Sequence, residues 1–300
     1  MIRKLLFAAL LVGPIAFGAA PALAQRDVPP PSPYAPLVDR PTCTRAELKA
    51  ATAAYVEAQR TGNLSGLNLD PKAHFLENMA TVERGAGTWN TALPIAHTMS
   101  LHDDKRCKTF TEIVVTGPRP YVIGTRLYLH QGRVIRVDSI VTKPGDWLFN
   151  ANSYLKYTSA ENWQPVLKYQ HTAPSEMIRG ANAYLDAFAD KFTDVPWGQP
   201  CARLEGGAYT NRDNKPDASC EVGIPAGVLY LVNRDYLVDE EMGAINVFCR
   251  FGSSVTGGPD SHTFKYIDGK LRAVHTLSAL QGPQADDNGA IIRAAAPARS

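Results

Sequence analysis

Internal repetition is the feature of this sequence that most limits what it can fold into. Three stretches of the first half have counterparts in the second half, in the same order and at similar spacing. The matched stretches are AELKAATAAYVEAQRTGN from Ala46 with SEMIRGANAYLDAFADKF from Ser175, HFLENMATVE from His74 with ARLEGGAYTN from Ala202, and LYLHQGRVIRVDSIVT from Leu127 with FKYIDGKLRAVHTLSA from Phe264. We therefore interpret the chain as two copies of one structural unit.

The alignment places residues of similar chemistry at matching positions in the two copies. In both copies, a turn joins two strand-like runs near the end of the unit. The matched positions are Tyr55 with Tyr184, Glu57 with Asp186, Glu77 with Glu205, Asp138 with His275, and the turn residues Gly132 and Gly269.

Each copy has the same order of local patterns. A helix-period stretch comes first, a polar glycine-rich connection follows, and alternating apolar runs such as YVIGTRLYL and AINVFCRFG complete it. Strands that follow a helix and are joined by hairpins predict an α+β fold with an antiparallel sheet. A curved sheet packed on a helix forms a cone, and the mouth of such a cone is a natural small-molecule pocket.

The N-terminus carries the marks of a secretory signal peptide. A basic MIRK, a short apolar run and a small-residue ALA site precede Gln25, so cleavage is expected near Ala24. The mature protein is then periplasmic or secreted, with no membrane insertion after signal cleavage. The predicted boundaries are a signal peptide at 1–24, a Pro-rich tether at 25–43, a first unit at 44–146, an aromatic connecting segment at 147–174, a second unit at 175–280 and a flexible tail at 281–300.

Charge and motif content narrow the function classes. The formal net charge is +2 and no basic stripe is interleaved with aromatic residues, so nucleic acid is not an expected partner. The sequence has no GxSxG, Walker loop, strand-following GxGxxG or HExxH, which argues against the common hydrolases, nucleotide enzymes and zinc proteases. The function classes that remain are acid–base catalysis without a cofactor and ligand binding. The sequence does not decide whether the protein is a monomer or a homo-oligomer.

Five cysteines in an oxidising compartment predict disulfides with one thiol left over. We expect Cys201 to pair with Cys220 across a short loop. Cys43 and Cys107 are the residual pair of the first half. Cys249 lies in the apolar run INVFCRF and is expected to be a buried free thiol.

The segments PCARLEGGAY, RDYLVDE and PDSHTFKYIDGKLRAVHTL resemble a secreted SnoaL-like domain family of unknown function. The order of helix, Gly-rich loop and curved sheet is similar to the nuclear-transport-factor-2-like (SnoaL-like) superfamily, here as a tandem pair from Thr44 to Leu280. The resemblance implies a cone-shaped apolar pocket. It also implies cofactor-free isomerases, dehydratases, cyclases or lyases of lignin-derived diarylpropanes, or pure binding domains, among which fold analogy does not choose.

Four residues of the second unit are catalytic candidates: Glu205, His262, His275 and Tyr184. Glu205 is either a general base, with a pKa raised by apolar walls, or a loop cap that accepts backbone N–H bonds. His262 and His275 flank the Gly269 turn and are expected to be near neighbours that shuttle a proton. The alternative for His262 is a core histidine held by Asp260. Tyr184 either donates to a substrate oxygen or is core.

In the first unit, His97 and Arg126 are the catalytic candidates. A charge in the middle of an apolar strand must be paired or face a wet cavity, so Arg126 either binds an oxyanion or phenolate or pairs with Glu112 or Asp138. Metal ligation by His97, His102 and Asp103 is disfavoured because a period of two places the histidines on opposite strand faces. We expect no metal site and no cofactor. The substrate-binding candidates are Tyr55, Glu77, Tyr121, Tyr128 and Asp138.

These patterns favour a cofactor-independent lyase, dehydratase or isomerase. The expected substrate is a small, apolar or aromatic, oxygenated molecule. The family resemblance alone supplies a concrete example, the deformylation of a lignin-derived diarylpropane. The alternative is a secreted small-molecule binding module without catalysis. Convergence of Glu205, His262 and His275 on one cavity would favour the enzyme.

Overall fold

The computed structural model describes residues 43–221 and 229–292. Both repeat units lie within a single compact body that begins at Arg40. The predicted signal peptide and nearly all of the predicted tether lie outside the described residues. No helix in the described part of the chain combines the length and apolar character needed to cross a bilayer.

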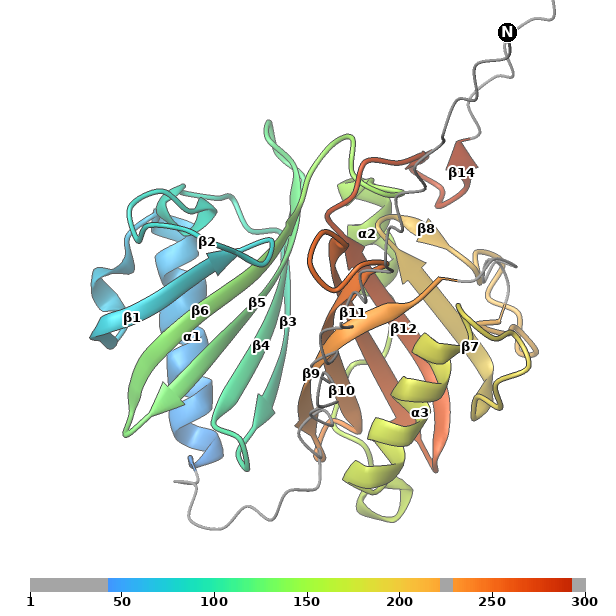
Figure 1. Ribbon diagram of the computed structural model, residues 1–300. Coiled ribbons are helices and arrows are strands. Elements are labelled where there is room, and N and C mark those ends of the chain that lie inside the picture. Colours follow the sequence, from blue (N-terminus) through green and yellow to red (C-terminus); the bar gives the residue numbers. More distant parts are fainter. Residues whose placement is uncertain (1–42, 222–228, 293–300) are drawn as a thin grey trace, which may run out of the picture. The chain divides into compact units, whose positions relative to one another are not determined.

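The first unit consists of a helix and a six-stranded sheet (Figure 1). Helix α1 spans Arg45–Thr61. It begins in a capping box, in which the side chain of Thr44 accepts from the backbone of Glu47 and the Glu47 carboxylate accepts from the backbone of Thr44. Two short 3-10 helices are Leu64–Gly66 and Thr88–Asn90. The strands are β1 (Leu69–Glu77), β2 (Ala80–Thr81), β3 (His97–Asp103), β4 (Lys108–Val115), β5 (Tyr121–His130) and β6 (Arg133–Thr142).

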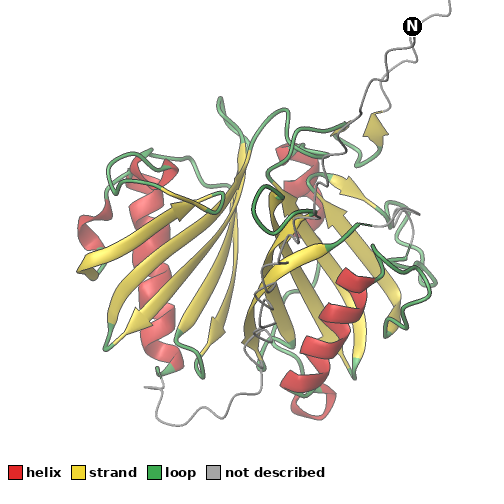
Figure 2. Ribbon diagram, in the orientation of Figure 1, coloured by secondary structure: helices red, strands yellow, loops and turns green. Residues whose placement is uncertain are grey.

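The second unit repeats this arrangement, with α3 (Pro174–Asp186) in place of α1 (Figure 2). Pro174 at the first helical position has the φ that a helix start requires. Its strands are β7 (Trp197–Glu205), β8 (Ala208–Tyr209), β9 (Leu231–Asp239), β10 (Ala244–Phe251), β11 (Gly258–Ile267) and β12 (Lys270–Ser278).

The two sheets have the same strand order, which confirms the two-unit α+β fold. The orders are β2-β1-β6-β5-β4-β3 and β8-β7-β12-β11-β10-β9. Within each sheet one pair is parallel, β1 with β6 and β7 with β12, and the other pairs are antiparallel. The sheets are therefore mixed rather than purely antiparallel as predicted. The parallel pair forms where the first long strand of each unit lies next to the last.

Alternation along the strands divides each sheet into two apolar faces. One face packs on the unit's own helix, as Figure 1 shows for α1 and α3. The other face joins a third apolar cluster that contains residues of both sheets, such as Phe110 and Phe248, whose rings meet edge to face at 6.2 Å. Strands buried on both faces explain why the sequence shows long apolar runs there.

The aromatic connecting segment contributes to both units. It contains α2 (Ala151–Thr158) and a 3-10 helix at Lys168–Gln170. Tyr154 donates to Glu112 of the first unit at 2.8 Å, and Tyr157 stacks on Tyr209 of the second unit.

Both predicted disulfides, Cys43–Cys107 and Cys201–Cys220, are present, and Cys249 is a buried free cysteine, as predicted. Beyond Ser278, in the segment assigned to a tail, β13 (Gln284–Ala285) pairs with β14 (Ile291–Ile292). This hairpin is anchored by the backbone of Tyr209, which donates to Gly289.

Candidate active-site pocket of the second unit

A cavity of about 660 Å³ opens in the second unit between α3, the sheet and the C-terminal hairpin. Its walls are mainly apolar, with Phe188, Phe251, Leu148 and Leu280 among the lining side chains. The polar side chains that line it include Tyr184, Arg203, Glu205, His262, Thr276 and Ser278. An apolar enclosure with a small set of convergent polar groups has the character of a small-molecule site.

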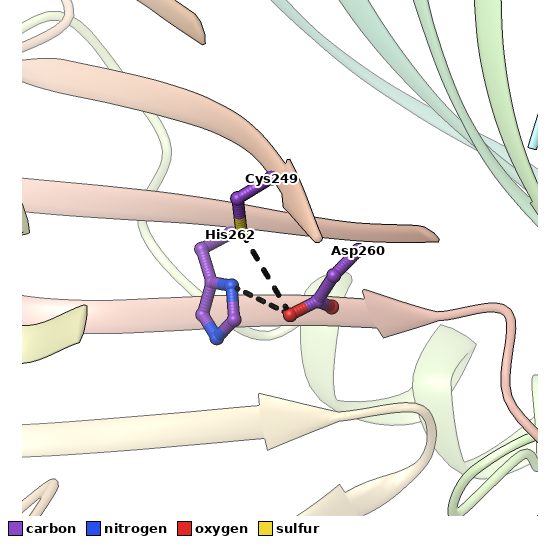
Figure 3. A group of neighbouring side chains, drawn as sticks. All are labelled: Cys249, Asp260 and His262. Atoms are coloured by element: carbon purple, nitrogen blue, oxygen red, sulfur yellow. Dashed lines mark hydrogen bonds and ion pairs between the residues drawn. The ribbon is translucent and has the colours of Figure 1, made fainter. Parts of the chain in front are cut away.

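His262 lies in the cavity wall and is backed by a buried carboxyl group (Figure 3). Asp260 and His262 are two residues apart on β11, so both point to the same face. The Nδ1 atom of His262 lies 3.3 Å from Oδ2 of Asp260. The other carboxyl oxygen, Oδ1, accepts from the hydroxyl of Ser278 at 2.8 Å. The expectation that Asp260 holds His262 agrees with this geometry.

Burial sets the protonation of this pair. Removal from water raises the pKa of Asp260 to about 8, although the Ser278 hydroxyl opposes the shift. Burial, with Arg203 and Arg234 nearby, lowers the pKa of His262 to about 3. At neutral pH the pair is therefore a protonated carboxyl group beside a neutral imidazole.

An ion pair between Arg203 and Glu205 also lies in the pocket wall. Nε of Arg203 is 3.3 Å from Oε2 of Glu205, and Nε1 of Trp147 donates to Oε1 of Glu205 at 2.7 Å. The Arg203 guanidinium also donates to the backbone carbonyl of Cys220 at 3.3 Å. The Cys201–Cys220 disulfide thus fixes a carbonyl that positions Arg203. Glu205 is held by side chains rather than by the backbone N–H bonds expected of a loop cap.

Four polar atoms of the pocket lining have no hydrogen-bond partner among the described residues. They are the hydroxyls of Tyr184 and Thr276, Nε of Arg203 and Nδ1 of His262; Nε faces Glu205 and Nδ1 faces Asp260. Burial raises the pKa of Tyr184 to about 12, while Arg203 beside it acts in the opposite direction. Buried polar groups are nearly always satisfied by protein, water or ligand, so the two hydroxyls mark where a bound molecule would make polar contacts.

The first unit provides an internal comparison, because the strand registers match. Ser139 lies opposite both Glu77 and Thr125, as Thr276 lies opposite both Glu205 and His262. The counterpart of His262 is therefore Thr125.

In the first unit the corresponding polar groups satisfy one another. Tyr55 donates to Thr125 at 2.7 Å, and Thr125 bonds to Ser139 at 2.7 Å. The positions of Arg203, Asp260 and Cys249 are taken there by Phe75, Ile123 and Ile113. Open polar groups at a cavity are thus a property of the second unit.

His275 does not reach this cavity, contrary to the expected convergence with His262. The predicted pairing of 262 with 276 is present, but it makes His275 the partner of Thr263, one residue along. Adjacent residues of a strand point to opposite faces. His275 is buried between Glu112 and Glu161, with Nδ1 3.1 Å from Oε1 of Glu112 and Nε2 bonded to Oε2 of Glu161.

Arg126 is also structural, and its predicted partners were wrong. Its guanidinium lies 3.1 Å from Oδ2 of Asp235 and donates to the side chain and backbone of Asn246. Asp138 is instead paired with Arg136, and Glu112 with His275. A residue of the second unit neutralises Arg126, which no pattern within the first unit could indicate.

The other first-unit candidates lie away from the pocket lining. Tyr128 donates to Asp235 at 2.7 Å, and Glu77 accepts from the backbone of Thr88 at 2.7 Å. Tyr121 packs at the edge of the first-unit core. His97 is half-buried on β3, and burial lowers its pKa.

Sequence reasoning missed Arg203, Thr276 and Ser278 as pocket residues. The alternation in DSH and HTLS could have shown that Asp260, His262, Thr276 and Ser278 share one face. Trp147 belongs to the aromatic connecting segment, and its contact with Glu205 is long-range.

One group in the described part of the chain has the spacing of metal ligands. Sγ of Cys249, the Asp260 carboxylate and a ring nitrogen of His262 all lie within 4.8 Å of one another. Figure 3 shows the three side chains facing one another across β10 and β11.

Comparison with known proteins matches one family model to part of the chain. A family model described as a domain of unknown function (DUF8021) matches residues 170–278, the greater part of the second unit. No curated protein matches the chain.

Solved structures that match each cover about one unit's length. AclR, a putative hydroxylase from Streptomyces galilaeus, is 14% identical over 34% of this chain and 82% of its own, with a TM-score of 0.24. An NTF-2-like protein of unknown function from Burkholderia xenovorans is 15% identical over 33% of this chain and 85% of its own, with a TM-score of 0.26.

Proposed function

We propose that the second unit binds a small, apolar, oxygenated molecule and catalyses proton transfer on it without a cofactor, as a lyase, dehydratase or isomerase. The observation that carries the proposal is the His262–Asp260 pair in the wall of an apolar cavity. The Asp260 carboxyl group, with a pKa near 8, can release or take up a proton close to neutral pH, and the neutral imidazole of His262 relays it. We place this activity in the periplasm or outside the cell, where the disulfides persist.

Each polar residue of the pocket has a separate role in the proposed reaction. His262 transfers a proton to or from the substrate, and Asp260 supplies or receives it behind the ring. The Tyr184 hydroxyl, with Arg203 beside it, donates to the substrate oxygen on which negative charge develops. Glu205 keeps Arg203 in place through the ion pair.

A phenolic aromatic dimer of lignin origin is the concrete substrate class we propose. Such a molecule can lose water and a one-carbon fragment when an acid helps a hydroxyl group to depart and a base accepts a proton. The phenol ring itself takes up the electrons. No organic cofactor is then required, and the cavity volume of about 660 Å³ lies in the range of small-molecule sites.

A binding module remains the second candidate. It is favoured by the position of His275, which lies outside this cavity, and by one further observation. The charges of Arg203 and Glu205 are already paired with each other. A pocket whose charged groups neutralise one another can hold a ligand without chemistry.

The test is incubation of the oxidised mature protein with a panel of phenolic dimers, with and without chelator, followed by mass spectrometry. We expect turnover that survives chelation. It should fall by at least about 100-fold in His262→Gln, the range of general acid–base catalysis. The rate should also decline as the pH rises through about 8, where Asp260 loses its proton.

Tyr266→Phe is the matched control for Tyr184→Phe. Both tyrosines are fully buried with unpartnered hydroxyls, but only Tyr184 lines the cavity. Loss of rate in Tyr184→Phe alone supports the proposed donor. No product combined with a ligand-induced rise in melting temperature would establish the binding module.

A further inference from the structure

The Cys249, Asp260 and His262 side chains form a cluster of three different donor atoms. Cys249 on β10 lies directly opposite Asp260 on β11, and His262 follows two residues later on the same face. All three are at most 1% exposed. The sulfur of Cys249 is 3.9 Å from Oδ2 of Asp260, and this same oxygen is 3.3 Å from Nδ1 of His262.

These separations are close to those of a tetrahedral metal site. Metal–nitrogen and metal–oxygen bonds near 2.1 Å place two ligand atoms about 3.4 Å apart, and a sulfur ligand adds a few tenths of an ångström. The observed 3.3 Å and 3.9 Å separations differ little from these values. The Cys249 sulfur and a ring nitrogen of His262 lie within 4.8 Å of each other, so a cation would draw these two side chains together.

The donor atoms are also available. Nδ1 of His262 has no hydrogen-bond partner among the described residues. Cys249 is the cysteine outside the two disulfides. Because Oδ1 of Asp260 accepts from Ser278 and from the backbone of Ser261, Oδ2 is the oxygen left facing the cluster.

We propose that Cys249, Asp260 and His262 bind one thiophilic divalent cation, such as Zn²⁺ or Cd²⁺. Sulfur and imidazole donors select such cations over Mg²⁺ and Ca²⁺, which prefer oxygen. The cavity is lined by His262 but not by Cys249 or Asp260, which are fully buried. Thiolate, imidazole and carboxylate are all ligands that Zn²⁺ takes in proteins.

Binding releases two protons. The Cys249 thiol becomes a thiolate and the Asp260 carboxyl group a carboxylate, while His262 binds as neutral imidazole. The two negative charges formed balance those of the cation. Because two protons must leave for the cation to bind, affinity increases with pH. The charged groups that influence the cluster are Arg203 and Glu205 on β7, Arg234 on β9 and Arg126 on β5.

The first unit has no equivalent cluster. The matching positions are Ile113, Ile123 and Thr125. The expected stoichiometry is therefore one cation per chain.

Occupancy would inhibit the proton transfer proposed above, a consequence that rests on that function. The cation uses the imidazole nitrogen and the carboxylate that exchange the proton. Chelation then increases turnover, whereas cation binding itself is measurable without any substrate.

The experiment is Cd²⁺ titration of the oxidised protein, with the thiolate-to-metal charge-transfer band in the ultraviolet as the signal. Equilibrium dialysis with Zn²⁺ gives the stoichiometry. We expect the band to saturate at one Cd²⁺ per chain. It should disappear in Cys249→Ala, and Zn²⁺ affinity should fall by about 10-fold or more in Cys249→Ala and His262→Gln.

His130→Gln, a change at an exposed histidine of the first unit, is the matched control and should bind as the parent does. Circular dichroism melts confirm that each variant is folded. Absence of the charge-transfer band, or Zn²⁺ binding unaltered by both cluster substitutions, would overturn the proposal. Neither result depends on turnover, so failure of the metal site is distinguishable from failure of the enzyme.

Discussion

Glu205 shows how one residue acquires its environment from distant parts of the chain. Arg203 approaches along the same strand, and Trp147 reaches it from the connecting segment. Arg203 is 6% exposed, so its charge depends on this carboxylate. Truncation of one member of a buried pair leaves the other uncompensated.

We expect Glu205→Gln to lower the free energy of unfolding by about 1–3 kcal/mol, because Arg203 loses its counter-charge. Urea denaturation measures the change. Glu77→Gln is the matched control at the equivalent position of the first unit. It keeps an acceptor for the Thr88 backbone and should lose less than about 1 kcal/mol. Equal losses in both variants would contradict the assigned ion pair.

At the scale of elements, the two faces of the β11–β12 hairpin have different roles. One face lines the pocket, and the other packs against the first unit. Residues 260 and 262 on β11, with 276 and 278 on β12, belong to the pocket face. His275 belongs to the opposite face. The Gly269 turn, with a φ of +71°, sets this register. A slip of β12 by one residue would turn His275 to the pocket face, on which His262 lies.

The two disulfides should differ in what they stabilise and by how much. Cys43–Cys107 closes a separation of 64 residues and Cys201–Cys220 one of 19. Loop-closure entropy then assigns about 4 kcal/mol to the first and about 3 kcal/mol to the second. Thermal melts of the paired Cys→Ala variants should show the larger loss for the first bridge.

The effect of removing each disulfide on ligand affinity should differ more than its effect on stability. The Cys220 carbonyl accepts from Arg203, so removal of the second disulfide should weaken ligand binding, and removal of the first should not. The opposite pattern would show that Arg203 is positioned by other contacts.

At the scale of the whole molecule, charged residues of the two units depend on one another. Arg126 of the first unit is paired with Asp235 of the second, and His275 of the second with Glu112 of the first. The first unit therefore has a defined role without a pocket of its own at the matching positions: it buries and neutralises the outer face of the second sheet.

His275 should make stability depend on pH. Burial opposes its charge, but Glu112 and Glu161 outweigh burial and raise its pKa to about 10. The unfolded value is about 6.5, so the native state binds the proton more tightly. Its contribution is complete below pH 6.5 and is lost as the pH rises through about 10.

The measurement is the difference in unfolding free energy between the parent and His275→Gln at pH 6, 8 and 10. We expect the difference to shrink steadily across this series. His130→Gln, at an exposed histidine of β5, controls for the general effect of pH. A difference that does not change with pH would show that His275 is uncharged in the native state.

Several features followed from the sequence alone. Period-3.6 and period-2 patterns and two glycine turns gave the α+β class and the repeat, because these signals are local. Both disulfides followed from cysteine number and spacing. Glu205, His262 and Tyr184 were identified as candidates, and the structure places all three at one cavity.

Only the tertiary structure decided which polar residues meet. Strand pairing places His262 and His275 on opposite faces of the second sheet. Contacts between distant parts of the chain pair Arg126 with Asp235 and bring Cys249 next to Asp260. It also decided that the polar groups of Tyr55, Thr125 and Ser139 satisfy one another while their counterparts line a cavity. Local patterns specify elements, but burial and contacts between strands far apart in the chain determine the site.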